Sequence, residues 1–148
     1  MDEQLIEIKD YLGNGYSQLV SYDQWRVAVL RFLDELLPEN MVTMERHLET
    51  DEVFILVRGR GMLLLGGNSQ IPDEIQSIIM DIGRVYNIKK NTWHTISLTK
   101  DAHVIIVEND DTDDSNSEVQ LMSEKDRLYT RDIVNKFLKG AFEIKENN

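Results

Sequence analysis

The sequence predicts a mainly β protein, built as an antiparallel sandwich or a closed barrel. Short runs of β-branched and aromatic residues recur at spacings of roughly 8–12 residues through the middle of the chain. Glycines and polar residues separate these runs, which is typical of tight turns between strands. Helical periodicity is confined to the two ends of the chain.

The predicted strands begin at Trp25–Phe32, where apolar residues alternate between two faces. Val53–Val57 and Met62–Leu65 are separated by the turn signal Arg58-Gly59-Arg60-Gly61, which predicts that the two runs form a hairpin. Together with four later runs, these strands predict a barrel core over roughly residues 24–109. The later strands are expected at Ile75–Ile82, Val85–Ile88, Trp93–Leu98 and His103–Val107.

A helix is expected on each side of the predicted barrel. Glu3–Leu12 has the spacing of a short amphipathic helix, which Gly13 would stop. Ser123 is a good N-cap for a C-terminal helix over roughly residues 123–139, because acidic residues follow it in the first turn. Gly140 suits the position just past the end of that helix.

The length and charge of the chain limit the classes of protein that it can represent. Its 148 residues are enough for one domain, and we expect a single domain over residues 1–148. There are 27 acidic residues against 16 lysines and arginines, so the formal charge is −11. A surface this acidic repels phosphate groups, which argues against partners such as nucleic acid or an anionic membrane.

The residue types that the chain lacks exclude further classes. No cysteine is present, which rules out disulfide frameworks, iron–sulfur clusters, cysteine zinc sites and thiol nucleophiles. Apolar runs such as Met62–Leu65 are too short to span a bilayer. The first residues, Met1–Gln4, are acidic where a secretory signal would be basic. We therefore expect a cytoplasmic protein.

The first segment with candidate site residues surrounds His47. Glu45 lies two residues before it, so both side chains share one face of a strand. The order His47, four residues, Glu52, six residues, Gly59 resembles the first sequence motif of the cupins. Two positions differ from that motif, because Glu45 replaces the first histidine of the family's His-x-His pair and Glu39 replaces its opening glycine.

The second segment follows the frame of the second cupin motif, in the order Gly83, five residues, Lys89-Lys90-Asn91, two residues, His94. The lysine and the asparagine replace proline and glycine, which affects turn geometry, and the motif's final asparagine is Leu98. The two motifs cover roughly residues 39–98. The resemblance implies a cupin-type jelly-roll barrel (a double-stranded β-helix) with a short N-terminal extension and a C-terminal α-helix.

In metal-binding cupins, the positions that match Glu45, His47, Glu52 and His94 hold the ion. The resemblance therefore implies a site of two imidazoles and two carboxylates, which suits divalent iron, manganese, nickel or zinc. The second carboxylate favours harder cations such as manganese. Glu45 could instead stay off the ion and act as a catalytic general base. The alternative is a metal-free pocket, in which these residues bond one another and a ligand.

Residues on the same face of the strand as Glu52 are expected to line the pocket, namely Phe54, Leu56 and Arg58. For Arg58, which sits at a turn, a solvated position at the rim is the alternative. His103 shares a face with apolar residues of its own strand, and we expect it to lie outside the site.

The resemblance implies a divalent-metal-dependent enzyme that acts on a small polar metabolite, such as a sugar derivative or an oxo-acid. Isomerisation, lyase chemistry and dioxygen insertion all stay open, because a fold does not define a reaction. The alternative is a non-catalytic barrel that binds or senses a small ligand. Resembling proteins often pair through N-terminal strands, so we also expect a homodimer in which the terminal helices or a second copy cover the strand at Trp25–Phe32.

Overall fold

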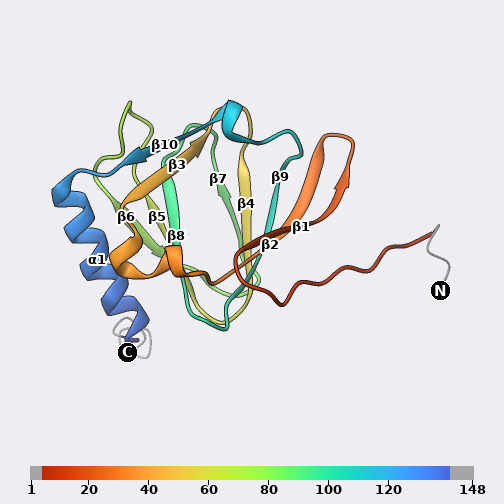
Figure 1. Ribbon diagram of the computed structural model, residues 1–148, viewed down its shortest axis with the longest axis horizontal. Coiled ribbons are helices and arrows are strands. Elements are labelled where there is room, and N and C mark those ends of the chain that lie inside the picture. The colour runs from red at the N-terminus through yellow and green to blue at the C-terminus, as the bar shows by residue number, and fades with distance from the viewer. Residues whose placement is uncertain (1–4, 141–148) are drawn as a thin grey trace.

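The computed structural model describes residues 5–140, which form two packed β-sheets with one α-helix at their side (Figure 1). The predicted mainly β fold is confirmed. Three short 3₁₀ helices lie at Asp34–Leu36, Pro38–Asn40 and Asp114–Asn116. The other elements are β1 (Tyr16–Tyr22), β2 (Trp25–Arg31), β3 (Thr43–His47), β4 (Glu52–Arg58), β5 (Gly61–Leu65), β6 (Gln76–Ile79), β7 (Val85–Ile88), β8 (His94–Leu98), β9 (His103–Asn109), β10 (Ser117–Leu121) and α1 (Glu124–Leu138).

The two sheets are antiparallel and have five strands each. Sheet A has the order β1-β2-β9-β4-β7, and sheet B has the order β10-β3-β8-β5-β6. Most strands that follow one another in the sequence, such as β8 and β9, lie in different sheets, so the chain crosses repeatedly between the two layers. This crossing pattern is the jelly-roll arrangement.

The predicted strands agree well with the observed ones, apart from β6, which is shorter than the expected Ile75–Ile82. The predicted hairpin is wrong. β4 pairs with β7 and β9 in sheet A, whereas β5 pairs with β6 and β8 in sheet B. The turn between β4 and β5 lies against another loop, because a Cβ on Gly59 would come within 2.6 Å of the Cα of Ala102. The chain therefore turns from one layer into the other at Gly59 instead of folding back on itself.

Two apolar clusters stabilise the sandwich. The first fills the space between the sheets and includes Leu56, Leu98 and Val104, none of which is more than 1% exposed. The second lies between the outer face of sheet B and α1, where Val134 and Phe137 meet apolar residues of β3 and β5. The first cluster covers one face of sheet B and the second covers the other. Both faces of β5 are therefore buried, which accounts for its continuous run of apolar residues.

The C-terminal helix prediction is confirmed. Ser123 is the N-cap, and its Oγ accepts a hydrogen bond of 3.1 Å from the backbone N–H of Asp126. Gly140 follows the helix with a φ of +78°, and its N–H donates to the carbonyl of Phe137 at 2.9 Å. No helix within residues 5–140 is long and apolar enough to cross a membrane.

The predicted N-terminal helix is wrong over its described part, residues 5–12, which form an arm without helical structure; Glu3 and Gln4 lie outside the described residues (Figure 1). Leu5, Ile8 and Leu12 are 84%, 70% and 71% exposed. A short helix is marginal in water unless its apolar face packs against another element. These side chains have no such packing, and their helical spacing alone does not produce a helix.

Candidate metal centre

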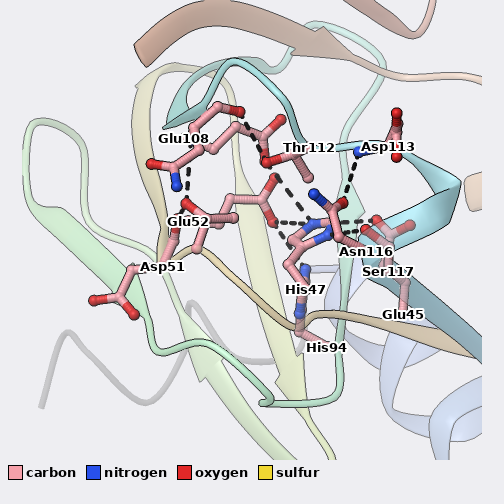
Figure 2. Close-up of polar contacts among 12 residues, drawn as sticks. Glu45, His47, Asp51, Glu52, His94, Glu108, Thr112, Asp113, Asn116 and Ser117 are labelled. Atoms are coloured by element: carbon pink, nitrogen blue, oxygen red, sulfur yellow. Dashed lines mark hydrogen bonds and ion pairs between the residues drawn. The ribbon is translucent and has the colours of Figure 1, made fainter. Parts of the chain in front are cut away.

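A cavity of about 460 Å³ opens at one end of the space between the two sheets. Its polar lining comes from inward-facing residues of four strands, and Figure 2 shows their side chains converging. The residues are Glu45 and His47 on β3, Glu52 on β4, His94 on β8 and Glu108 on β9.

The alternation of side chains along each strand places these residues on the inner faces of their sheets. Glu45 and His47 are two residues apart on β3 and both line the cavity. The backbone of Glu45 is paired with that of His94 on the neighbouring strand, which brings the two motifs together within sheet B. Glu52 reaches the same point from the first position of β4 in sheet A. The structure thus brings together all four residues that the sequence singled out.

The Glu52 carboxylate lies at the centre of the cluster. Its Oε1 is 2.9 Å from Nε2 of His94 and 3.3 Å from Nε2 of His47. Oε1 of Glu45 lies 3.7 Å from the same nitrogen of His47. Three of these side chains are buried, with exposures of 8% for His47, 7% for Glu52 and 6% for His94, whereas Glu45 is 50% exposed at the mouth.

The other ring nitrogen of each histidine contacts a group outside the cluster. Nδ1 of His94 is 2.9 Å from the carbonyl oxygen of Thr92, so it carries the proton that this bond requires. Nδ1 of His47 is 2.8 Å from Oγ of Ser117 on β10. Such contacts fix the orientation of an imidazole and leave its Nε2 directed at the centre, which is the arrangement that metal-binding histidines use.

Glu108 is the site residue that sequence reasoning missed. Its side chain is 3% exposed, and its Oε2 lies 3.9 Å from Nε2 of His47. The sequence did contain a signal for it, because side chains alternate along a strand and Glu108 follows Val104 and Ile106 on the inward face. The predicted strand ended at Val107, one residue too early to include it.

The mutual proximity of these charged groups shifts their pKa values. Burial alone would raise the pKa of Glu52, but His47 and His94 beside it hold that pKa well below its usual range. Burial would likewise lower the pKa of both imidazoles, but the Glu52 carboxylate raises both. Burial and the nearby charge of Glu52 raise the pKa of Glu108 to about 7, against the opposing effect of Arg26.

The predicted pocket lining is only partly right. Phe54 lines the cavity, and its ring meets that of His94 edge-on at a centroid distance of 6.1 Å. Leu56 lies deeper, in the apolar cluster between the sheets. Arg58 is exposed and does not line the cavity, because it lies at the end of β4 opposite to Glu52. His103 lies on the other face of β9, as expected, and does not line the cavity.

The donor atoms fit a divalent cation. Around an ion with bonds of about 2.1 Å, adjacent donors of a tetrahedral or octahedral set lie about 3.0–3.4 Å apart. The observed separations of 2.9, 3.3 and 3.7 Å are close to that range. In addition, Nε2 of His47 is buried without a hydrogen-bond partner, although it faces the carboxylates. A cation among these atoms would use this nitrogen, which the protein side chains leave unbonded.

Neither a family model nor a curated protein matches the sequence. Solved structures do match the fold. The structure of CapF with the inhibitor 3-isopropenyl-tropolone aligns with a TM-score of 0.54 and 18% identity over 74% of this chain; the chain spans 33% of the length of CapF. A variant of Streptomyces PAC13 with uridine aligns with a TM-score of 0.50 and 13% identity, over 78% of this chain and 87% of that one. A cupin-2 domain protein from Shewanella frigidimarina NCIMB 400 aligns with a TM-score of 0.47 and 18% identity, over 67% and 84%.

The sheets, their crossing pattern and the cluster at one end define a jelly-roll sandwich with an internal polar pocket. The chain has the cupin-type jelly-roll fold that the two sequence motifs predicted, and it shares this fold with CapF and PAC13.

Proposed function

We propose that this protein is a divalent-metal-dependent enzyme that acts on a small polar metabolite. One observation carries the proposal, namely the convergence of both buried Nε2 atoms on Oε1 of Glu52 beside an open cavity of about 460 Å³. That volume lies within the range of small-molecule sites, which measure about 300–1,000 Å³. A catalytic metal site needs buried protein ligands next to open space, because the substrate must reach a free coordination position on the ion.

His47, Glu52 and His94 are the residues that would hold the ion. A divalent cation at this point would polarise a substrate oxygen or lower the pKa of a bound water. Glu45 differs from the other three because half of its side chain is exposed at the mouth. It can therefore serve either as a fourth ligand or as a general base that takes a proton from a substrate entering the cavity.

The charge of the lining favours a sugar derivative over an oxo-acid. Asp113 and Asp114 add two acidic residues to the described lining, in which Arg26 is the one lysine or arginine. Arg26 is already engaged by Glu108 and by the carbonyl oxygens of Asp110 and Thr112. The proposed ion itself could bind a substrate carboxylate, but beyond the ion this lining offers the carboxylate repulsion and no free cationic side chain, whereas the hydroxyl groups of a neutral sugar can bond the acidic groups.

A non-catalytic ligand-binding barrel is the second candidate function. The cavity and its polar lining suit that role equally well, with or without an ion. Turnover distinguishes the two candidates. An enzyme consumes one member of a panel of neutral sugars and nucleosides, with uridine included because it is bound to PAC13, whereas a binding protein shows thermal stabilisation without product.

We also propose that the protein is a homodimer formed through the outer face of sheet A. Tyr22 and Trp25 are 71% and 44% exposed on this face, and their rings contact each other at a centroid distance of 6.1 Å across the β1–β2 pair, which gives an exposed aromatic surface of the kind that partners cover. Val57, 42% exposed, lies on the same face at the other end of the sheet. Sedimentation analysis tests this proposal. The native chain should have the mass of a dimer and Trp25→Glu that of a monomer, and a monomeric native chain would refute the pairing.

The metal site is tested by metal analysis of the purified protein with a matched pair of histidine variants. We expect about one divalent ion per native chain, its loss in His47→Ala, and its retention in His103→Ala, because His103 does not line the cavity. Thermal melts of both variants establish that each is folded. Equal metal content in His47→Ala and His103→Ala would show that the proposed site is wrong.

A further inference from the structure

Glu108 is the most deeply buried acidic side chain of the cluster, at 3% exposure. It lies at the end of β9, on the face that carries Val104 and Ile106 into the apolar core. An ionised carboxylate in this position is expensive to bury unless both of its oxygens have partners. The partners of Glu108 therefore indicate what the residue does.

The two oxygens of Glu108 have very different surroundings. Oε1 accepts hydrogen bonds from Nη2 and Nε of Arg26 at 2.7 and 3.2 Å and from the hydroxyl of Tyr16 at 3.1 Å. Oε2 is buried and has no hydrogen-bond partner. It faces Nε2 of His47 at 3.9 Å, and that nitrogen also has no hydrogen-bond partner, although Oε1 of Glu52 lies 3.3 Å from it. Arg26 and Tyr16 thus hold the carboxylate by one oxygen and leave the other directed at the cluster.

Two unbonded buried polar atoms that face each other are unusual in a folded protein. The separation of 3.9 Å is too long for a hydrogen bond between them, but it lies between the spacings of adjacent and opposite donors around one cation, which are about 3.0–3.4 Å and about 4.2 Å. His47, Glu52 and Glu108 offer donor atoms that all lie within 4.8 Å of one another. Figure 2 shows the Glu52 and Glu108 carboxylates together beside the His47 ring.

We propose that Glu108 binds the divalent ion directly through Oε2, as a ligand additional to His47, Glu52 and His94. This inference rests on the metal site proposed above. Arg26 and Tyr16 are positioning residues in this arrangement, because they occupy Oε1 and limit Glu108 to one bond with the ion. An added carboxylate makes the donor set harder, so the site should prefer manganese over zinc more than the sequence motifs alone imply.

The test is a titration with Mn²⁺ alone, followed by electron paramagnetic resonance, on the native protein, Glu108→Gln and Glu118→Gln. Glu118 is the matched control because it is also paired with an arginine, Arg46 at 2.9 Å, but does not line the cavity. We expect Glu108→Gln to bind Mn²⁺ about 10-fold or more weakly, and Glu118→Gln to bind like the native chain. The visible absorption of bound Co²⁺ should also change in Glu108→Gln, because that spectrum reports on the ligands themselves.

The outcomes separate the two proposals. Native protein that binds Mn²⁺, with Glu108→Gln equal to it in affinity and in Co²⁺ spectrum, would overturn the role of Glu108 and leave the metal site standing. Native protein that binds no divalent ion would overturn both proposals. If Glu108→Gln does not fold, Glu108→Asp replaces it, since this variant keeps the charge but shortens the side chain. An unchanged Co²⁺ spectrum in Glu108→Asp would also refute direct binding.

Discussion

The two ends of the space between the sheets are built from the same three strands but differ in chemistry. At one end, β4, β8 and β9 contribute Leu56, Leu98 and Val104, all 1% exposed or less. At the other end, the same strands contribute Glu52, His94 and Glu108, with side chains 3–7% exposed. The polar end is therefore almost as deeply buried as the apolar end.

This difference shows how one scaffold separates stability from binding. A step of two residues along a strand moves a side chain by about 6.6 Å without changing its face, so each strand passes from the apolar end to the polar end in a few residues. At the apolar end burial alone stabilises the fold. At the polar end burial is tolerated because each charged side chain lies beside a group of opposite charge. Two of its atoms, Nε2 of His47 and Oε2 of Glu108, have no hydrogen-bond partner and are available to a cation.

The largest effect on folding is expected from the apolar end. Leu98→Ala removes a fully buried side chain and should lower the free energy of unfolding by about 2–5 kcal/mol, measured by urea denaturation. Leu128→Ala is the control, because Leu128 on α1 is 57% exposed and its loss should change stability by about 0.5 kcal/mol or less. The metal content per folded molecule should stay unchanged in Leu98→Ala. Loss of the ion from folded Leu98→Ala would show that the two ends are not independent.

A smaller effect is expected when the polar end is changed. Glu52→Gln removes the charge that both imidazoles face at 2.9 and 3.3 Å. At a Mn²⁺ concentration of about 100 times the dissociation constant, the native protein should gain about 2.7 kcal/mol of stability, and Glu52→Gln should gain little of it. Thermal melts with Mn²⁺ and with a chelator measure this gain. A gain equal to the native one in Glu52→Gln would contradict the central position of Glu52.

The smallest expected effect is a pH dependence of the metal-free protein. Glu52 has a lowered pKa, so its contribution to stability is present above its unfolded value of about 4.5 and is lost as the pH falls further. His47 and His94 have raised pKa values, so their contribution is present below about 6.5 and is lost as the pH rises through their folded values. Glu52 and the two histidines should therefore stabilise the metal-free protein most between about pH 4.5 and 6.5. Glu108 acts against them within this range, because its pKa is raised to about 7 and its contribution is present below about pH 4.5 and lost as the pH rises through 7.

Melts in chelator across this range test the pH dependence, with Glu52→Gln as the variant that should lack it. Added Mn²⁺ should act in the opposite direction, because the ion binds neutral imidazoles and is displaced by protons. Metal-induced stabilisation should consequently be larger at pH 8 than at pH 5.5. A metal effect that does not change with pH would argue against imidazole ligands.

Most of the fold could be predicted because its signals are local. Short runs of apolar residues located β2 and β9, and the Ser123 cap with Gly140 bounded α1. The errors occurred where local signals were ambiguous. The arm at residues 5–12 has helical spacing but no surface to pack against, and the turn at Gly59 has hairpin composition but joins two sheets. Both outcomes depend on distant contacts that a sequence window does not contain.

The candidate site divides in the same way. Glu45, His47, Glu52 and His94 stand at motif spacing, and the structure brings them together. Glu108 stands at no informative spacing from any of them, and neither do its partners Arg26 and Tyr16. These three residues reach the cavity through strand pairing, since β2 pairs with β9 and β1 pairs with β2.

By itself, the sequence determined the strand-rich composition, the C-terminal helix and the identity of four polar residues, because alternation, capping and motif spacing act over a few neighbouring residues. The tertiary structure alone decided which strands share a sheet, that the Leu56 end is apolar while the Glu52 end is open, and that Glu108 presents an unbonded oxygen to His47. The physical reason is that backbone pairing and burial are satisfied between segments far apart in the chain, where no local pattern specifies the partner.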